Sequence, residues 1–82
     1  MDTRIDFKPF QNVKQYDHLI VSCHNSSIII DLKNATIKQN NHSFYVEWLA
    51  LYVGVSFINF EIEQIIAVNP INNQLYIELS SL

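Results

Sequence analysis

The sequence predicts a mainly β protein, in which a short N-terminal helix precedes a five-stranded, bent antiparallel sheet that forms a partial barrel. Three observations support this α+β prediction. Helical spacing of apolar residues occurs near the N-terminus, whereas residues 27–79 alternate between apolar and polar side chains. Short turns, many of them containing Asn, separate the alternating segments. The 82 residues include one glycine and two prolines. We therefore expect a single domain over residues 1–82 with one thin hydrophobic core.

Composition indicates the broad class of protein. The chain is 49% hydrophobic and 16% charged, and its one cysteine, Cys23, cannot form a disulfide within the chain. A lone thiol is typical of a reducing compartment. No basic N-terminal region leads into an apolar run, and the longest apolar runs are much shorter than the ~20 residues of a membrane span. We expect a cytoplasmic protein that does not enter a membrane.

The N-terminal third contains the predicted helix. Residues 1–12 include Pro9 and show no periodic pattern, so we expect an extended lead-in. Residues 13–24 carry apolar side chains at helical spacing, namely Tyr16, Leu19, Ile20 and Cys23. Asn12 is a residue type that caps helices. We therefore expect a helix over residues 13–24, with a strand through residues 19–21 as the alternative.

The strands of the predicted sheet follow in order and are separated by short polar turns. Alternation predicts strands at 27–33, 35–39, 44–53, 55–60 and 75–79, with a short extended segment at 65–68. Gly54 turns the third strand into the fourth, and residues 69–73 form the clearest turn in the chain. A bent, partly closed sheet of the Sm-like or SH3-like kind suits such strands, because closure removes exposed edges.

The sequence contains no pattern typical of catalysis or metal binding. Cys23 is the one thiol, and its place on the apolar face of the predicted helix indicates a packing role. His18 and His24 lie six residues apart, which does not bring them together on one helix face as a metal pair. A single glycine, Gly54, is too few for a phosphate-binding loop. We expect no enzymatic activity, no bound metal and no cofactor.

Charge favours a protein partner over a nucleic acid. Five Lys and Arg residues face eight Asp and Glu residues, which gives a net charge of -3, and the basic residues are scattered singly. Binding RNA through its phosphates requires a clustered basic surface. The ten aromatic residues could stack on bases, but basic residues are not interleaved among them. Core packing and protein contact are therefore the favoured roles of the aromatic residues.

Short motifs occur in a defined order along nearly the full length of the chain: Phe7-Lys8-Pro9, Tyr16-Asp17-His18-Leu19, Cys23, Leu32-Lys33, Val46-Glu47-Trp48-Leu49, Glu63-Gln64-Ile65 and Asn69-Pro70. In their order and spacing these motifs resemble the Rof family, the Rho-binding antiterminators that modulate Rho-dependent transcription termination. The resemblance implies an Sm-like fold and a non-enzymatic inhibitor. Such a protein docks on the N-terminal RNA-binding region of the Rho hexamer and blocks access of RNA.

The resemblance also implies which residues contact the partner. Asp17, with its neighbours Tyr16 and His18, is expected to contact the basic residues that Rho uses for RNA. Glu47 and Glu63 are secondary candidates for the same acidic surface. From the residues alone, Glu63 also has a second interpretation, as part of a solvated strand edge.

The chain departs from the family in three places, and two alternative functions remain. Acidic residues are typical of the family at positions 13–15 and 20, where this chain has Val13-Lys14-Gln15 and Ile20, and the turn after Lys33 lacks the usual glycine. One alternative is an Sm-like RNA-binding module that stacks bases on exposed aromatic residues. The other is a structural module that forms a homo-oligomer by burying Ile29, Tyr45 or Val53.

Overall fold

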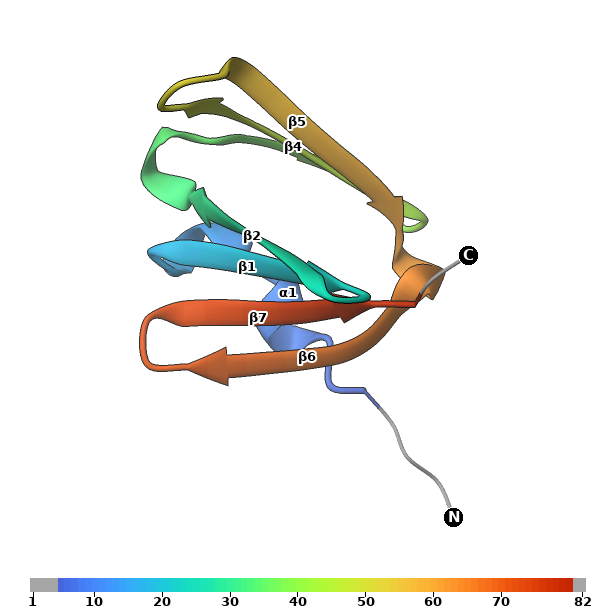
Figure 1. Ribbon diagram of the computed structural model, residues 1–82. Helices are drawn as coiled ribbons and strands as arrows, with labels where there is room; N and C mark the ends of the chain where they lie inside the picture. Colours follow the sequence, from blue (N-terminus) through green and yellow to red (C-terminus); the bar gives the residue numbers. More distant parts are fainter. Residues whose placement is uncertain (1–4, 81–82) are drawn as a thin grey trace.

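The computed structural model describes residues 5–80 and shows a mainly β protein, as the sequence predicts (Figure 1). Seven strands are present in this range: β1 (His18–Cys23), β2 (Ser26–Asp31), β3 (Thr36–Gln39), β4 (Ser43–Ala50), β5 (Gly54–Glu61), β6 (Ile65–Ile71) and β7 (Gln74–Leu79). Helical structure is limited to four short elements of the described chain: α1 (Lys8–Gln11) and the 3-10 turns η1 (Val13–Gln15), η2 (Leu32–Asn34) and η3 (Ile62–Gln64).

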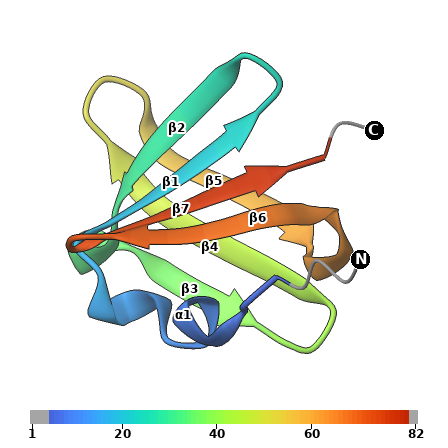
Figure 2. The ribbon, with the colours of Figure 1, turned by 90° about the horizontal axis from the view of Figure 1, so that it is seen from below.

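The strands form two sheets that face each other. One sheet has the strand order β2-β1-β7-β6 and the other has the order β3-β4-β5. β1 and β7 are parallel, and the other neighbouring pairs are antiparallel. α1 lies against β6, and in the view from below it is seen along one side of the sheets (Figure 2). η2 joins β2 to β3 and η3 joins β5 to β6, so these two crossings connect the sheets.

The predicted five-stranded antiparallel partial barrel is therefore wrong in its details. The chain forms seven strands in two sheets, and these do not close into a barrel. The number rises because residues 18–23 form a strand instead of a helix and because the segment at 65–68 extends into a full strand, β6. The parallel pairing arises because β7 returns beside β1 in the same direction.

The predicted helix over residues 13–24 is also wrong. The chain makes the single 3-10 turn η1 and then enters β1, which is the alternative strand. Leu19 and Val21 point into the core and Ile20 is buried on the opposite face. β1 lies between β2 and β7, so both of its edges are paired, and β-branched residues such as Ile20 and Val21 favour the pleated conformation.

The prediction of an extended lead-in over residues 1–12 is wrong for residues 8–11, which form a helical turn. Residues 1–4 lie outside the described residues, and Lys8–Gln11 form the single helical turn α1. Pro9 stands in the first turn, where its missing N–H costs no intrahelical hydrogen bond. The turn directs the Phe10 side chain into the core.

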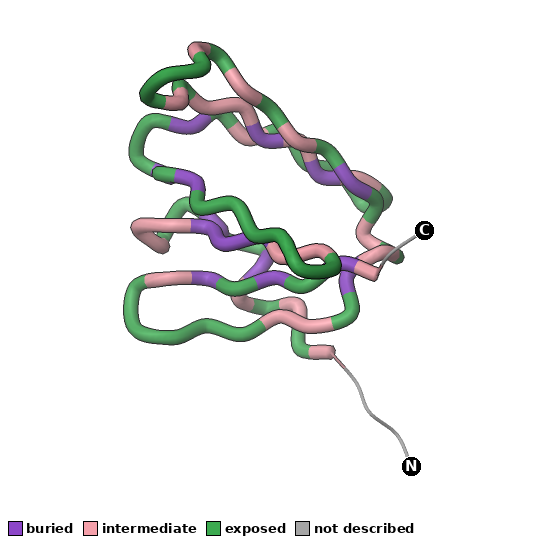
Figure 3. Tube along the Cα trace, viewed as in Figure 1, coloured by how far each residue is buried: buried purple, intermediate pink, exposed green. Residues whose placement is uncertain are grey.

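The core lies between the two sheets. At its centre Phe44 of β4 packs against Phe10 of α1 and Phe60 of β5, with ring centroids 4.8 and 5.2 Å apart, respectively. Buried aliphatic residues complete it: Val13, Leu19, Val21, Ile30, Leu32, Ala35, Val46, Ile65, Leu75, Ile77 and Leu79. The buried segments lie on strands of both sheets (Figure 3). None of the described polar or charged residues is buried, so apolar contact is what joins the sheets.

The turns differ from the predicted ones at two places. β4 ends at Ala50 instead of continuing to residue 53, and the chain turns before Gly54, whose φ of 93° favours glycine. β6 continues through Pro70, so the turn predicted at residues 69–73 is confined to its last two positions, with Asn72 at φ 55°. Proline is tolerated there because β6 is an edge strand.

Candidate functional site

The motif Tyr16-Asp17-His18 follows η1 and ends on the first residue of β1, where the chain enters the four-stranded sheet. The backbone N–H of Asp17 donates a hydrogen bond to the carbonyl of Asn73 at 2.7 Å, and the N–H of Leu32 donates to the Asp17 carbonyl at 3.0 Å. These bonds connect the segment to the β6–β7 turn and to η2. Asp17 is therefore held by its backbone, although it does not lie on the expected helix.

The carboxylate of Asp17 is available to a partner. The Asp17 side chain is 47% exposed, and the closest described cation is Lys33, whose Nζ lies 4.0 Å from Oδ1 and whose side chain is 75% exposed. An ion pair this long and this solvated contributes at most about 1 kcal/mol. Asp31 differs, because its carboxylate accepts hydrogen bonds from the Lys33 N–H and the Asn34 side chain and so caps η2.

The two neighbours of Asp17 offer less to a partner. Tyr16 is half-buried and packs against the core. His18 is half-buried, and its ring Nδ1 is covered without a hydrogen bond to any described residue. Of the three residues in the motif, Asp17 is the one that presents a charged group to solvent.

The structure separates Glu63 from this motif. β7 begins beside His18, and just beyond its far end the Ser80 N–H donates to the carbonyl of Gln64 in η3. The six residues between these points span about 20 Å of extended chain. Glu63, an exposed member of η3, therefore cannot contribute to the same contact as Asp17 unless the partner covers the whole sheet.

Glu47 lies on the outer face of the three-stranded sheet and already has a partner within the chain. The Tyr45 hydroxyl donates to Glu47 Oε1 at 2.8 Å. This hydrogen bond raises the pKa of Tyr45, and partial removal from water and the charge of Glu47 act in the same direction. The Tyr45 ring also stacks on Phe57, with centroids 5.7 Å apart. Glu47 is therefore a weaker candidate for a docking acid than Asp17.

Three of the lysines lie at separate places on the molecule, and one of them is held by hydrogen bonds. Lys14 Nζ donates to the carbonyls of Leu32 and Ala35 at 2.7 and 2.8 Å. Lys33 lies beside Asp17. Lys38 Nζ stands 6.0 Å from the centroid of the Tyr45 ring, on the outer face of the other sheet. This distribution does not resemble the clustered basic surface that phosphate binding requires.

The β4–β5 hairpin exposes a group of apolar residues, most of which the sequence pattern did not indicate as a surface. They are between 65% and 94% exposed, and we call them the apolar hairpin: Leu49, Leu51, Tyr52, Val53, Val55 and Phe57. The tip of this hairpin is exposed in Figure 3. The sequence feature that indicates this surface is the absence of any charged residue between Trp48 and Phe60. An exposed apolar group of this size indicates an interaction surface.

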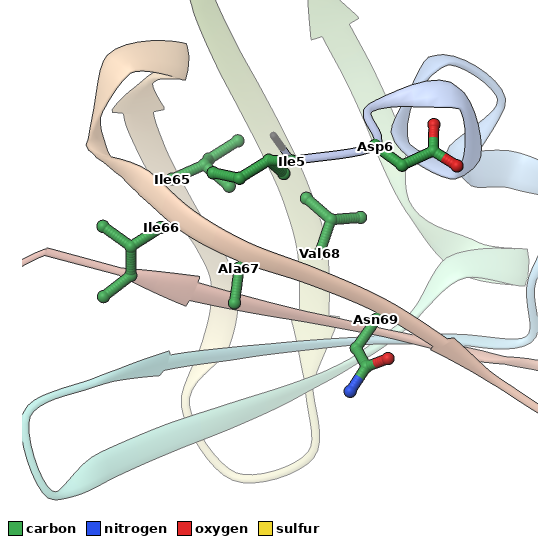
Figure 4. A pocket seen from close by; sticks show the side chains of 7 residues that line it. All are labelled: Ile5, Asp6, Ile65, Ile66, Ala67, Val68 and Asn69. Atoms are coloured by element: carbon green, nitrogen blue, oxygen red, sulfur yellow. The ribbon is translucent and has the colours of Figure 1, made fainter. Parts of the chain in front are cut away.

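A groove of about 680 Å³ runs along β6 (Figure 4). It is lined by Ile5, Asp6 and residues 65–69 of β6, which are mostly apolar. Asp6 is the one charged group in this lining, and its Oδ1 already accepts a hydrogen bond from the Lys8 N–H at 3.0 Å. The groove brings no second titratable group to Asp6, so it offers no acid–base or nucleophilic pair.

The described chain holds neither a metal cluster nor a membrane helix. Over residues 5–80, His, Cys, Asp and Glu do not gather in groups of three that could hold a metal ion. His18 is the first residue of β1 and His24 follows its last residue, so the two histidines are separated by the length of the strand. None of the helices in the same range has the length and apolar character needed to cross a membrane. The absence of metal, cofactor and enzymatic activity stays a prediction.

Comparison with models of known protein families yields no match, and neither do comparisons with curated proteins and with solved structures.

Proposed function

We propose that this chain is a non-enzymatic, cytoplasmic inhibitor of Rho-dependent transcription termination, which binds the N-terminal RNA-binding region of Rho and blocks access of RNA. The motif Tyr16-Asp17-His18-Leu19 supports the choice of partner through its resemblance to the Rof family. The observation that carries the proposal is the half-exposed Asp17 carboxylate on a backbone held by two hydrogen bonds. Kinship of the two facing sheets with Sm-like folds is part of the same proposal.

Electrostatics favours docking of Asp17 at an RNA-binding surface. A groove that binds phosphates carries positive potential, and this potential attracts a carboxylate as well as a phosphate. Because the backbone of Asp17 is already fixed, its ordering on binding costs less than that of a flexible segment. The net charge of -3 steers the whole chain toward a basic partner.

The ion pair with Lys33 does not oppose this docking. At 4.0 Å, with both side chains largely solvated, the pair contributes at most about 1 kcal/mol to the free chain. A guanidinium or ammonium group of the partner could replace Lys33 at close range, where a charge-assisted hydrogen bond is stronger. Lys33 can then turn into solvent, since its side chain is 75% exposed.

An RNA-binding module is the second candidate. The exposed rings of Tyr52 and Phe57 on the apolar hairpin are the observation in its favour, because exposed rings can stack on bases. The basic residues count against it, because they are scattered singly along the chain and Lys14 already donates hydrogen bonds to two backbone carbonyls. We therefore rank direct RNA binding below docking on Rho.

The test is a titration of labelled single-stranded RNA on Rho in the presence and absence of this protein, at two salt concentrations. We expect the protein to displace the RNA at micromolar concentration and low salt. Asp17→Asn should weaken this competition by about 1–3 kcal/mol if the contact is desolvated, and by less than ~1 kcal/mol if it lies at a solvated rim. Glu63→Gln is the matched control, because it makes the same carboxylate-to-amide change about 20 Å away.

Three results would argue against the proposal. Undisturbed RNA binding at micromolar protein and low salt would contradict it. Equal losses in Asp17→Asn and Glu63→Gln would show that overall charge matters and that Asp17 is not a specific contact. Direct binding of the RNA by this protein without Rho would favour the RNA-binding module.

A further inference from the structure

The four edge strands of the two sheets are protected to different degrees. An exposed edge offers unpaired backbone groups to another chain unless it is short, charged or interrupted by proline or a bulge. β3 has four residues and contains Lys38. β6 contains Pro70 and a register shift between Ile65 and Ala67. β2 has six residues, begins with two serines and ends with Asp31.

β5 is the longest edge strand and has none of these protections along most of its length. It has eight residues, pairs with β4 without a register shift, and has no charged residue or proline before Glu61. Val55, Phe57 and Asn59 are exposed on its outer face. Two of these three residues also belong to the apolar hairpin, so the open edge and the exposed apolar side chains form one continuous surface.

We propose that β5 pairs antiparallel with β5 of a second copy of this chain. The two three-stranded sheets then join into one six-stranded sheet, with a twofold axis perpendicular to the sheet at Phe57. Such an interface is isologous, because the same strand is used by both copies.

The lack of charge along most of the β5 edge supports a second copy of this chain as the partner that pairs with it. An uncharged strand neither requires a partner of opposite charge nor repels its own copy, whereas edges that carry Lys38 or Asp31 would bring like charges together. Glu61 is the one charged residue of β5. With the axis at Phe57, it lies opposite Val53 of the second copy and about 27 Å from the second Glu61, beyond a Debye length of about 10 Å.

The side chains of β5 support this register. Residues directly opposite in an antiparallel pair share a face, with Cβ atoms about 4.5–5.5 Å apart. The axis at Phe57 places the two Phe57 rings next to each other and sets Val55 opposite Asn59. Because each Phe57 already stacks on Tyr45, four aromatic rings would form one cluster across the axis.

The apolar hairpin supplies a large part of the area that a stable dimer buries. At 150–250 Å² per aromatic side chain, Tyr52 and Phe57 alone expose on the order of 240–400 Å². A stable interface buries about 800 Å² on each partner, and the exposed leucines and valines of the apolar hairpin add to the aromatic area. In the proposed register, Tyr52 comes beside η3 of the second copy, so the tip of the hairpin is covered as well.

Sedimentation equilibrium from micromolar to near-millimolar protein tests the proposal. The mass of the wild type should rise from 9.6 kDa toward twice that value as the concentration increases. Phe57→Lys places a charge on the axis and should hold the protein at the monomer mass. Ile29→Lys is the matched control, because Ile29 is also 65% exposed but lies on β2, and this variant should associate as the wild type does. Circular dichroism checks that both variants fold.

Cross-linking tests the register. In a Cys23→Ser background, Phe57→Cys should form a disulfide-linked dimer, because opposed Cα atoms about 4.5–5.5 Å apart suit a disulfide. Asn59→Cys faces Val55 of the second copy and should not cross-link. A wild type that stays at 9.6 kDa throughout, a Phe57→Lys variant that associates normally, or equal cross-linking at positions 57 and 59 would each overturn the proposal. A monomeric wild type whose Rho binding is lost in Phe57→Lys would assign this face to Rho instead.

Discussion

Phe44→Ala removes the central ring of the aromatic cluster that joins α1, β4 and β5. The Phe44 side chain is 0% exposed, and its ring packs on Phe10 and Phe60 at centroid distances of 4.8 and 5.2 Å. Truncating a buried Phe costs about 3–5 kcal/mol, and losing two ring pairs places this site near the upper end. At about 0.05–0.15 kcal/mol per residue, the whole chain has on the order of 4–12 kcal/mol of stability, so the variant should lose a large part of it.

The assay is urea unfolding followed by circular dichroism, with Phe44→Leu as a milder variant that should fold and lose about 0.5–3 kcal/mol. Phe57→Ala is the control, because it removes the same ring from a side chain that is 65% exposed on the other face of the same sheet. We expect a loss of less than about 1 kcal/mol for this control. Equal losses in Phe44→Ala and Phe57→Ala would refute the assignment of inner and outer faces to this sheet.

Three further predictions concern the polar contacts and the turns. Lys14→Met should lower the free energy of unfolding by about 1–3 kcal/mol, because two backbone carbonyls lose a charged donor, whereas Lys38→Met should change it by less than ~1 kcal/mol. Equal effects in chemical unfolding would contradict the structural role of Lys14. The Tyr45 hydroxyl should ionise above its usual pKa of 10.0 in an ultraviolet titration, and Glu47→Gln should move that ionisation toward lower pH. Because the pKa of Tyr45 is raised in the folded state, the stability that comes from this hydrogen bond is present below pH 10 and is lost as the pH rises through the pKa of the folded protein. An unchanged Tyr45 titration in Glu47→Gln would argue against the hydrogen bond. Asn72→Val should destabilise the protein by about 1–2 kcal/mol, because residue 72 has a positive φ that a β-branched residue disfavours. Asn72→Gly should be nearly neutral, and thermal unfolding that ranks the two variants in the reverse order would contradict this prediction.

The mainly β class could be predicted because most strands keep one face buried and the other solvated. β7 illustrates this, since Leu75, Ile77 and Leu79 are buried while the residues between them are exposed. β1 was predicted only as the alternative to a helix, because Leu19, Ile20 and Val21 are all buried and the strand therefore shows an apolar run instead of alternation. The periodicity of a short apolar run cannot separate a central strand from a helix. The parallel pairing of β1 with β7 depends on segments more than fifty residues apart, which no local pattern reports.

The candidate site could be predicted only in part, because the distances between its residues depend on the assembled sheet. The resemblance placed Asp17 in the docking motif, and the structure leaves its carboxylate half-exposed, but the expected helix beneath it is replaced by backbone hydrogen bonds to Asn73 and Leu32. The separation of Glu63 from Asp17 follows from the length of β7, which only the assembled sheet determines. The apolar hairpin was missed because its residues were assigned to a strand that continues to position 53, although the chain turns after Ala50.

The proposed docking site can be tested residue by residue with an isotope-labelled sample of this protein. The sample is titrated with the N-terminal RNA-binding region of Rho, and each backbone amide is followed by nuclear magnetic resonance. Docking through Asp17 predicts that the largest shifts occur at residues 16–18 and at their hydrogen-bonded partners Asn73 and Leu32, and that Glu63 is unaffected. Unchanged spectra at micromolar partner and low salt, or shifts confined to the apolar hairpin, would contradict the proposed docking site.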